Sequence, residues 1–319
     1  MTNRRTFLKQ FSFLMSMGIF PITACAKPEQ KMKHIGIQLF SLPKLLEKDF
    51  VAAIKMLSEM GYTELELYGP YPFSQNSAKE RWLTITPSLG FSGSGFFGKN
   101  ITEVKSILND HGMTTPSAHT DLDTLMNGMG QLAEAAHILG YDYVTLPAIP
   151  DDKRKSLDDY KQIAETFNLI GENAKKEGIK FAYHNHGYGI KPLENGIVPL
   201  EIIIENTDPD LVFLEMDIFW TVAGGADPIT YLKKYPNRYH LLHLKDMKPK
   251  KQFSGDGGDA TQWIELFPFM KAVGEGELGA KAIVETAIET GVKHFFVEQD
   301  MVAEPEIELK KSIDFLKSV

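Results

Sequence analysis

The feature that most constrains the fold is a repeated unit, in which a glycine closes an amphipathic segment and an apolar run of strand length follows. The unit recurs at Gly61, Gly112, Gly140, Gly178 and Gly291. A closing glycine is typical of a helix, because glycine readily adopts the left-handed conformation in which many helices end. The short apolar runs predict strands. Helices and strands that alternate in this way predict a parallel sheet.

We predict eight strands with amphipathic segments between most of them. They lie near residues 34–40, 63–68, 114–119, 142–147, 179–185, 211–217, 239–244 and 293–298. Eight such units predict an α/β fold, a single-domain (β/α)8 TIM barrel over residues 34–319. An open doubly wound sheet would normally carry a glycine-rich phosphate loop after its first strand. The residues there, Leu39-Phe40-Ser41-Leu42-Pro43, do not form such a loop.

The first 24 residues have the features of an export signal. Arg4 and Arg5 form a twin-arginine pair, and residues 11–24 carry no charge. That stretch is too short for a bilayer, which takes about 20 apolar residues. It ends at Ile22-Thr23-Ala24-Cys25, which resembles the lipobox of bacterial lipoproteins. We expect a twin-arginine or lipoprotein-type signal peptide over 1–24, then a linker over 25–33; a flexible hydrophobic N-terminus is the alternative.

Charge and cysteine content narrow the range of partners. Cys25 is the only cysteine, so the barrel can form no internal disulfide and no cysteine-based metal site. The formal charge is -8, and it becomes -11 without residues 1–24, which contain three basic and no acidic residues. Nucleic-acid binding needs a basic surface, so we expect no such partner. We expect an exported protein, periplasmic or anchored to the membrane by a lipid at Cys25, of unspecified oligomeric state.

Polar residues gather at the C-terminal ends of the predicted strands, where TIM-barrel enzymes carry their chemistry. They are His119, Asp121, His184, His186, Asp217, His243, Lys245, Glu298 and Asp300. Each has a simpler interpretation: a strand histidine can be structural, Asp217 can cap the next segment, and Glu298 can pair with a lysine. However, carboxylates that face a barrel interior need partners. Histidine and carboxylate ligands from four strands favour one divalent metal, Mn²⁺, Co²⁺, Zn²⁺ or Fe²⁺ rather than Ca²⁺.

Five motifs in the C-terminal half carry a family resemblance. They are FAYHNH at 181–186, EMDIFW at 215–220, HLKDM at 243–247, GEGEL at 274–278 and FVEQD at 296–300. In this order they resemble the sugar isomerase/epimerase superfamily with a xylose isomerase-like TIM barrel, which includes apurinic endonuclease relatives. The resemblance implies one metal ion, held by His184, Asp217, His243 and Glu298. It also implies a small carbohydrate substrate and proton abstraction beside a metal-bound carbonyl.

The resemblance fails at two positions. The family's Glu-Asn-His reads His184-Asn185-His186 here, and its Asp-x-x-His ends at Trp220. The chain therefore lacks the glutamate that would face Glu298 across the sugar, and His186 or His119 would supply the second acid or base. Our predicted residues are Glu298, His186 and Lys245 for catalysis, and His119, Trp220 and Phe96 for substrate binding. A surface lysine is an equally simple interpretation of Lys245.

We expect a divalent-metal-dependent isomerase or epimerase that acts on an unphosphorylated sugar or glycoside. A 3-keto-glycoside lyase is one alternative, because β-elimination uses the same enolate and needs a single base. A non-catalytic exported sugar-binding lipoprotein is an alternative of a different class. Residues 70–100 contain many aromatic and glycine residues. They predict a long loop that closes over the sugar, or one that packs its own aromatic side chains on the barrel.

Overall fold

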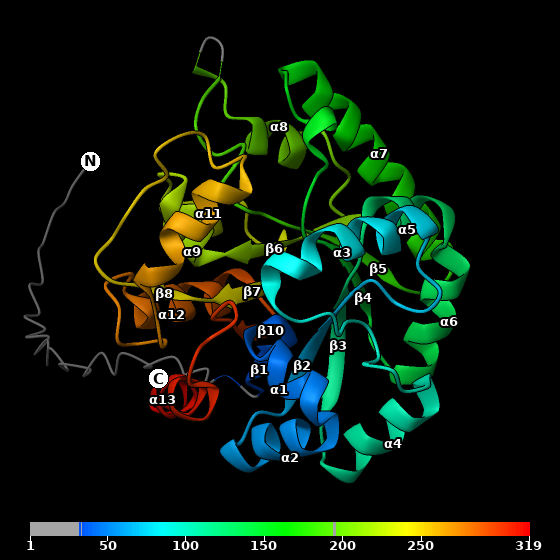
Figure 1. The fold of residues 1–319 in the computed structure, drawn as a ribbon. Coiled ribbons are helices and arrows are strands. Elements are labelled where there is room, and N and C mark those ends of the chain that lie inside the picture. Colours follow the sequence, from blue (N-terminus) through cyan, green and yellow to red (C-terminus); the bar gives the residue numbers. More distant parts are fainter. Residues whose placement is uncertain (1–31, 33, 194–195) are drawn as a thin grey trace, which may run out of the picture. The chain divides into compact units, whose positions relative to one another are not determined.

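The chain forms a closed barrel of eight parallel strands with helices around it, as the computed structural model shows (Figure 1). The structure describes residues 32, 34–193 and 196–319, and the chain from Met32 to Val319 is one compact unit. The predicted TIM barrel is therefore confirmed. The predicted signal peptide over 1–24 lies outside the described residues, as does most of the linker.

Each of the eight predicted strands is present in the barrel. Their bounds are β1 Gly36–Gln38, β2 Glu64–Tyr68, β3 Thr114–His119, β4 Tyr143–Leu146, β5 Lys180–His184, β6 Val212–Asp217, β7 Tyr239–Leu244 and β10 His294–Val297. The order around the barrel is β1-β10-β7-β6-β5-β4-β3-β2, and all neighbours pair in parallel. The C-terminal ends of the strands consequently meet at one rim. Two short strands outside the prediction, β8 Asp246–Met247 and β9 Met270–Lys271, form a separate antiparallel pair.

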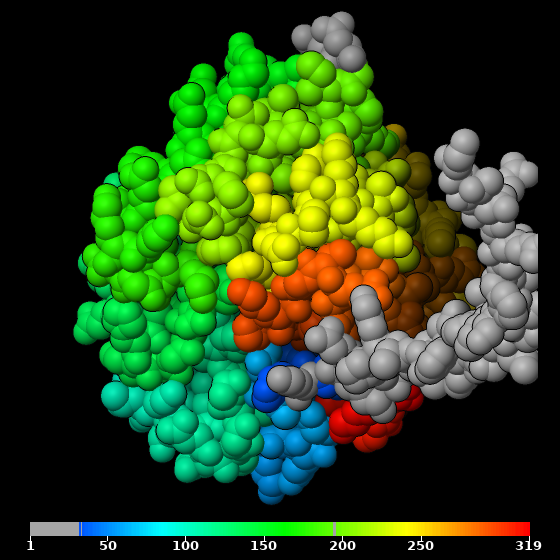
Figure 2. Space-filling model, turned by 180° about the vertical axis from the view of Figure 1, so that it is seen from behind, coloured from blue at the N-terminus to red at the C-terminus, as the bar shows by residue number. Residues whose placement is uncertain are grey.

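Helices follow the strands around the outside of the barrel (Figure 1). In the space-filling view, the colours of successive chain segments follow one another around the molecule (Figure 2). They are α1 Pro43–Lys48, α2 Phe50–Met60, α3 Asn76–Leu89, α4 Ile101–Asp110, α5 Leu122–Asn127, α6 Met129–Leu139, α7 Leu157–Lys176, α8 Pro199–Glu205, α9 Ile218–Ala223, α10 Pro228–Lys234, α11 Ala260–Leu266, α12 Ala280–Thr290 and α13 Pro305–Lys317. Among the described residues, none of these helices combines the length and the apolar character that crossing a membrane requires.

Helix α7 illustrates how the sequence specifies these elements. It begins with a capping box, in which the Asp159 amide donates to the Ser156 hydroxyl and the Ser156 amide donates to the Asp159 carboxylate. Its apolar side chains recur at steps of three and four and are buried against the strands. At the ends of α2 and α12, Gly61 and Gly291 have φ angles of 102° and 103°, as the predicted helix-closing role requires.

The barrel interior is apolar only in its middle layer. Tyr143, Ala182, Leu241 and Phe296 form this layer, with Phe213 packed against it. The inward-facing residues nearer the C-terminal ends of the strands are charged or polar, and those nearer the N-terminal ends include Glu64, His240 and His294. The larger apolar core lies between the strands and the helices. The middle layer therefore separates two polar regions at opposite ends of the barrel.

The segment 70–100 differs from the predicted loop because it contains α3. This helix buries none of its side chains, and Leu83 within it is 67% exposed. After α3, the ring of Phe96 lies 5.5 Å from that of Tyr71 and 6.2 Å from that of Phe73. Segment 70–100 thus packs its own aromatic side chains against one another, which is the second of the two predicted alternatives. Closure of this segment over a substrate stays a prediction.

Candidate metal centre

Four adjacent strands deliver the predicted ligands to one place. His184 and Asp217 are the last residues of β5 and β6, His243 lies near the end of β7, and Glu298 follows β10. Asp217 is the direct neighbour of His243 in the sheet. All four side chains are buried. Parallel pairing thus brings together residues that are far apart in sequence.

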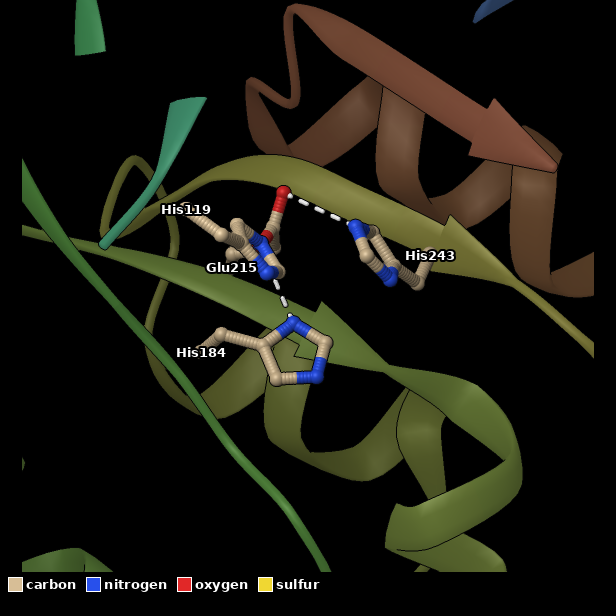
Figure 3. Close-up of side chains that lie close together, drawn as sticks. All are labelled: His119, His184, Glu215 and His243. Atoms are coloured by element: carbon tan, nitrogen blue, oxygen red, sulfur yellow. Dashed lines mark hydrogen bonds and ion pairs between the residues drawn. The ribbon is translucent and has the colours of Figure 1, made fainter. Parts of the chain in front are cut away.

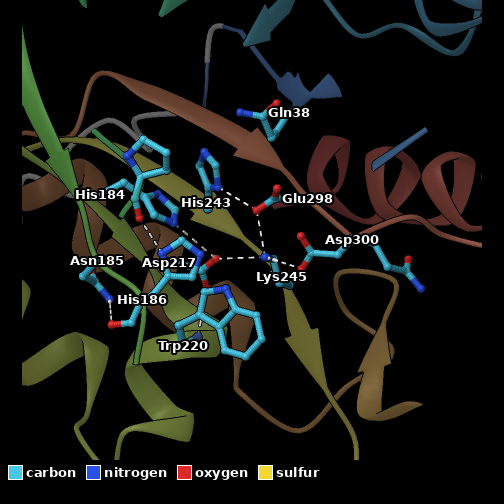
Figure 4. A network of polar contacts seen from close by, with 12 residues as sticks. Gln38, His184, Asn185, His186, Asp217, Trp220, His243, Lys245, Glu298 and Asp300 are labelled. Carbon is cyan, nitrogen blue, oxygen red and sulfur yellow. Dashed lines mark hydrogen bonds and ion pairs between the residues drawn. The ribbon is translucent and has the colours of Figure 1, made fainter. Parts of the chain in front are cut away.

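The ligand atoms of these residues face one another. Asp217, His243 and Glu298 each offer one atom, and these atoms lie within 4.8 Å of one another. Nδ1 of His243 is 2.9 Å from Oε2 of Glu298, and Nε2 of His184 is 4.0 Å from Oδ2 of Asp217 (Figure 4). Two imidazole nitrogens and two carboxylate oxygens are a ligand set that suits the predicted metals.

One carboxylate oxygen of Asp217 caps the next helix, as the simpler interpretation of this residue predicts, and the other oxygen is directed into the candidate site. The amide of Trp220 donates to Oδ1 at 3.0 Å, which caps the N-terminus of α9. Oδ2 points toward the centre, 3.1 Å from Nζ of Lys245. Capping and metal binding are therefore compatible roles for this residue.

Lys245 is not a surface residue, since its side chain is 1% exposed. Its ammonium lies 3.1 Å from Asp217, 2.8 Å from Glu298 and 2.7 Å from Asp300 (Figure 4). Burial alone would lower the pKa of Lys245, but these carboxylates raise it well above its usual value. Burial, followed by repulsion from Glu298, raises the pKa of Asp300 to about 7. The carboxylates outnumber the ammonium, so the cluster has a residual negative charge that a divalent cation would compensate.

A second layer of charged side chains lies beneath this centre. Nε2 of His119 donates to Oε2 of Glu215 at 2.7 Å and lies 3.0 Å from Oε2 of Glu66. Figure 3 shows Glu215 among the rings of His119, His184 and His243. His119, which we predicted to bind substrate, thus makes its polar contacts with buried carboxylates.

The charges of this lower layer balance without an ion. Burial would lower the pKa of His119, but Glu66 and Glu215 raise it to about 9. Burial would likewise lower the pKa of His243, yet Glu215, Glu298 and Glu66 raise it well above its usual value. Conversely, these histidines hold the pKa of Glu66 below its usual value, although burial alone would raise it. His119, His184, Glu215 and His243 are also near enough to hold a metal ion, but their charge balance makes the upper set the better candidate.

His186 lies beside the centre as a neutral imidazole. Burial, and then the charge of Lys245, lower its pKa to about 3. Its Nδ1 donates to the carbonyl of Pro147 at 2.5 Å, which leaves Nε2 with a lone pair. Trp263 stacks on the His186 ring at 4.6 Å between centroids, and Trp220 stacks on it at 5.9 Å.

The two predicted substrate-binding aromatics lie in different places. The ring of Trp220 is 5.1 Å from Nζ of Lys245, so it borders the candidate centre. Phe96 instead packs within the aromatic cluster of segment 70–100. Any contact of either ring with a substrate stays a prediction.

Sequence reasoning did not assign Glu66, Glu215 or Gln38 to the site. The Gln38 amide donates to Oε2 of Glu66 at 2.7 Å, which extends the network to β1. A signal was present, because Glu64 and Glu66 alternate along β2 and Glu215 stands two residues before Asp217. Carboxylates at such positions face the barrel interior and need partners there.

Known proteins share parts of this sequence. The family described as xylose isomerase-like TIM barrel matches residues 54–319. An inosose dehydratase of Clostridium tetani is 38% identical over 92 residues, 28% of this chain and 30% of the relative. One of Bacillus cereus is 27% identical over 190 residues, 55% of this chain and 60% of the relative. The chain thus aligns with less than two thirds of the length of these curated relatives.

Solved structures share the fold over nearly the whole chain. A sugar phosphate isomerase/epimerase from Parabacteroides distasonis has a TM-score of 0.70 at 24% identity, covering 94% of this chain and 99% of that chain. The 3-keto-D-glucoside 4-epimerase of E. coli has a TM-score of 0.57 at 17% identity, and the match covers 91% of this chain and 100% of the epimerase chain. An IolI protein with a bound zinc atom has a TM-score of 0.62 at 14% identity, and the match covers 89% of this chain and 95% of the IolI chain. At these identities the likeness concerns the fold.

Proposed function

The chain belongs to the xylose isomerase-like TIM barrel family, and from this premise we propose that it is a divalent-metal-dependent enzyme that acts on an unphosphorylated keto-sugar or keto-glycoside. The reaction that we propose begins with removal of a proton from the carbon next to the ketone. The observation that carries this proposal is the convergence of Asp217, His243 and Glu298, with Nε2 of His184 4.0 Å from Asp217, around a centre with excess carboxylate charge. A metal ion held there would act as a Lewis acid on the ketone oxygen.

Glu298 is the base in this proposal. Burial alone would raise its pKa, but Lys245 and His243 hold the pKa of Glu298 below its usual value, so the carboxylate is ionised at neutral pH. Oε2 contacts both of these partners. We assign Oε1 to take the proton.

Lys245 stabilises the negative charge that develops when the proton leaves. Its ammonium is permanently charged at neutral pH and is already held in place by three carboxylates. A fixed positive charge in a water-poor site stabilises a developing enolate oxygen more than a solvated charge does. The same side chain thus offsets part of the negative charge of the centre.

The second half of the reaction that we propose is β-elimination. The electron pair of the broken C–H bond forms a C=C bond, and the C–O bond of the neighbouring carbon breaks. The departing oxygen takes up the proton that Glu298 removed and leaves as water or an alcohol, so Glu298 is ionised again. Epimerisation would instead require an acid on the opposite face of the substrate. At the family's glutamate position this chain has His184, whose Nδ1 is bonded to Glu215 and whose Nε2 faces Asp217. The names of the curated relatives, inosose dehydratases, also favour a lyase.

Epimerisation or isomerisation is the second candidate function. The observation that favours it is the Nε2 lone pair of His186 beside the centre. We place it second because the names of the curated relatives, inosose dehydratases, favour elimination.

The test is a reaction in heavy water with a panel of 3-keto-glycosides, inososes and free keto-sugars. The chelator-treated protein is supplied with Mn²⁺, Co²⁺ or Zn²⁺, and NMR follows deuterium incorporation and products. We expect metal-dependent formation of an unsaturated ketone, with a loss of about 100-fold or more in Glu298→Gln. Glu64→Gln is the matched control, because Glu64 lies on the same barrel interior but pairs with His294 at the other end.

The possible results separate the candidate functions. Deuterium exchange with retention of the C–O bond identifies an epimerase or isomerase. Binding of the sugar without exchange or product, with any of the metals, identifies a non-catalytic sugar-binding protein and contradicts the enzyme proposal. Full turnover in Glu298→Gln shows that the base is another residue.

We also propose export, which the twin arginines at Arg4-Arg5 and the junction at Cys25 support. Cell fractionation and metabolic labelling with a fatty acid check this. Labelling that is lost in Cys25→Ser is the expected result, and unlabelled protein in the cytoplasmic fraction is the contrary one.

A further inference from the structure

We infer that Glu66 and Glu215 are positioning residues, which lie beneath the candidate ligands and fix the ring orientations of His184 and His243 and the tautomer of His184. The metal-binding part of this inference rests on the proposed function. The residues come from β2 and β6, and both side chains are completely buried.

A buried carboxylate is costly unless hydrogen bonds satisfy it. Glu66 accepts from the Gln38 amide at 2.7 Å and from Nε2 of His243 at 2.7 Å. Glu215 accepts from His119 at 2.7 Å and from Nδ1 of His184 at 3.0 Å. His119 lies within 3.0 Å of Glu66 as well, so it links the two carboxylates into one network.

This network determines which nitrogen of each candidate ligand faces the metal centre. An ionised carboxylate can only accept, so the nitrogen opposite it must carry the hydrogen. For His184 that nitrogen is Nδ1, and Nε2 therefore carries the lone pair, 4.0 Å from Oδ2 of Asp217. A ligand to a metal needs this arrangement.

His243 is oriented in the same sense from the opposite side. Nε2 donates to Glu66 below the ring, and Oε1 of Glu215 lies 3.3 Å away from the same nitrogen. Nδ1 is then the nitrogen directed toward Glu298, at 2.9 Å. Because Glu298 is also an ionised carboxylate, this nitrogen carries a hydrogen in the metal-free protein, which a bound metal ion would displace. A half-turn of either ring would place C–H groups against a buried carboxylate and lose a charged hydrogen bond. The two rings are therefore held in the orientation that a metal ligand requires.

The experiment measures metal binding directly. Isothermal titration of the chelator-treated full chain with Mn²⁺ compares the wild type with Glu215→Gln and Glu66→Gln. We expect the dissociation constant to rise about 10–100-fold in each variant, as happens when the carboxylate partner of a metal-binding histidine is lost. Glu64→Gln is the matched control, since Glu64 is also buried on β2 and bonded to a histidine, His294, away from the centre. It should leave the dissociation constant unchanged within about twofold.

A second readout separates positioning from a general structural effect. Proton–nitrogen correlation NMR of the metal-free protein identifies the protonated nitrogen of His184. We expect Nδ1–H in the wild type and in Glu64→Gln, and a mixture with the Nε2–H tautomer in Glu215→Gln. Thermal unfolding of each variant checks that it is folded under the titration conditions.

Three results would overturn the inference or part of it. An Nε2–H tautomer in the wild type contradicts it, as does unchanged Mn²⁺ affinity in Glu215→Gln. Two ions per wild-type chain, with one lost in Glu215→Gln, would make Glu215 a ligand instead of a positioning residue. If the wild type binds none of Mn²⁺, Co²⁺ and Zn²⁺, the proposed function fails, while the tautomer measurement still decides whether Glu215 positions His184.

Discussion

The positive charge of Lys245 compensates the buried carboxylates of the candidate centre. Its ammonium contacts Asp217, Glu298 and Asp300, and its side chain is almost completely buried. Removing one partner of such a buried cluster leaves uncompensated charge, which costs about 3–5 kcal/mol. The geometry therefore makes the lysine a stability determinant as well as a proposed participant in catalysis.

We expect Lys245→Met to lower the free energy of unfolding of the metal-free protein by about 3–5 kcal/mol. Mn²⁺ should restore much of this loss, because the ion would compensate the same carboxylates, so the metal-induced rise in melting temperature should exceed that of the wild type. Lys180→Met is the control, since Lys180 forms a partly exposed pair with Asp142 near the other end of the barrel. A metal effect that is equal in Lys245→Met and the wild type would show that the ion binds elsewhere.

At the same scale, the sequence predicted the polar residues of the rim but not their mutual contacts. His184, Asp217, His243 and Glu298 could be proposed because each stands at the end of a strand. The contact of Glu66 with His243 could not, because the two residues meet across the barrel and strand periodicity does not specify contacts between distant strands. The burial of Lys245 was equally inaccessible to sequence reasoning, since it depends on three partners at the ends of two other strands, β6 and β10.

At the scale of elements, Asp246 connects β8 to the loop 274–278. Its Oδ2 accepts from the amides of Gly274 at 3.0 Å and Gly276 at 3.1 Å, and its Oδ1 accepts from Leu278 at 3.2 Å. A Cβ at Gly276 would lie 2.0 Å from Oδ1. The HLKDM and GEGEL motifs thus form one structural unit, in which Asp246 organises the backbone of the loop.

We expect Gly276→Ala to lower the free energy of unfolding by about 1–3 kcal/mol, because the methyl group displaces this carboxylate. Gly130→Ala, within α6, is the matched control. A Cβ added at Gly130 would lie more than 4 Å from every neighbouring side chain that the structure describes, so alanine there should stabilise by about 0.5–1 kcal/mol. Chemical denaturation measures both, and an unaffected Gly276→Ala would contradict the role of Asp246.

Elements with a strong repeat were predictable, and those without one were not. The eight barrel strands follow from glycine-closed helices and apolar runs. Helix α3 was not predicted, because it has no periodic row of buried apolar side chains and contains Pro87. Strands β8 and β9 have two residues each, too few for any periodicity to appear.

At the scale of the whole molecule, the end of the barrel opposite the candidate centre also contains a buried histidine with a low pKa, His240. At the end opposite the candidate centre, His240 stacks on Phe213 at 4.1 Å, and its Nδ1 lies 2.9 Å from the Tyr143 hydroxyl. Burial, and then the charges of Lys293, Lys180 and His294, lower the pKa of His240 to about 4. His240 is therefore neutral in the folded protein at neutral pH. In TIM barrels, polar residues at the N-terminal ends of the strands, where His240 lies, serve stability. Catalytic residues lie at the C-terminal ends of the strands.

The low pKa of His240 predicts a loss of stability in acid. The unfolded chain protonates His240 below about pH 6.5, whereas the folded protein does so only near pH 4, so its contribution is complete above pH 6.5 and falls as the pH drops to about 4. We expect His240→Gln to reduce the decline in free energy of unfolding between pH 7 and pH 4.5 by about 1–2 kcal/mol. His137→Gln, at an exposed position of α6, is the control. Identical pH profiles for wild type and His240→Gln would show that this histidine does not carry the acid sensitivity.

The most direct test of the central claim is the position of a metal ion in a crystal of the full chain grown with Mn²⁺ and measured for anomalous scattering. We predict one peak per chain, about 2 Å from Nε2 of His184, Oδ2 of Asp217, Nδ1 of His243 and an oxygen of Glu298. A peak among His119, Glu66 and Glu215, or no peak from protein that binds Mn²⁺ in solution, would contradict the claim.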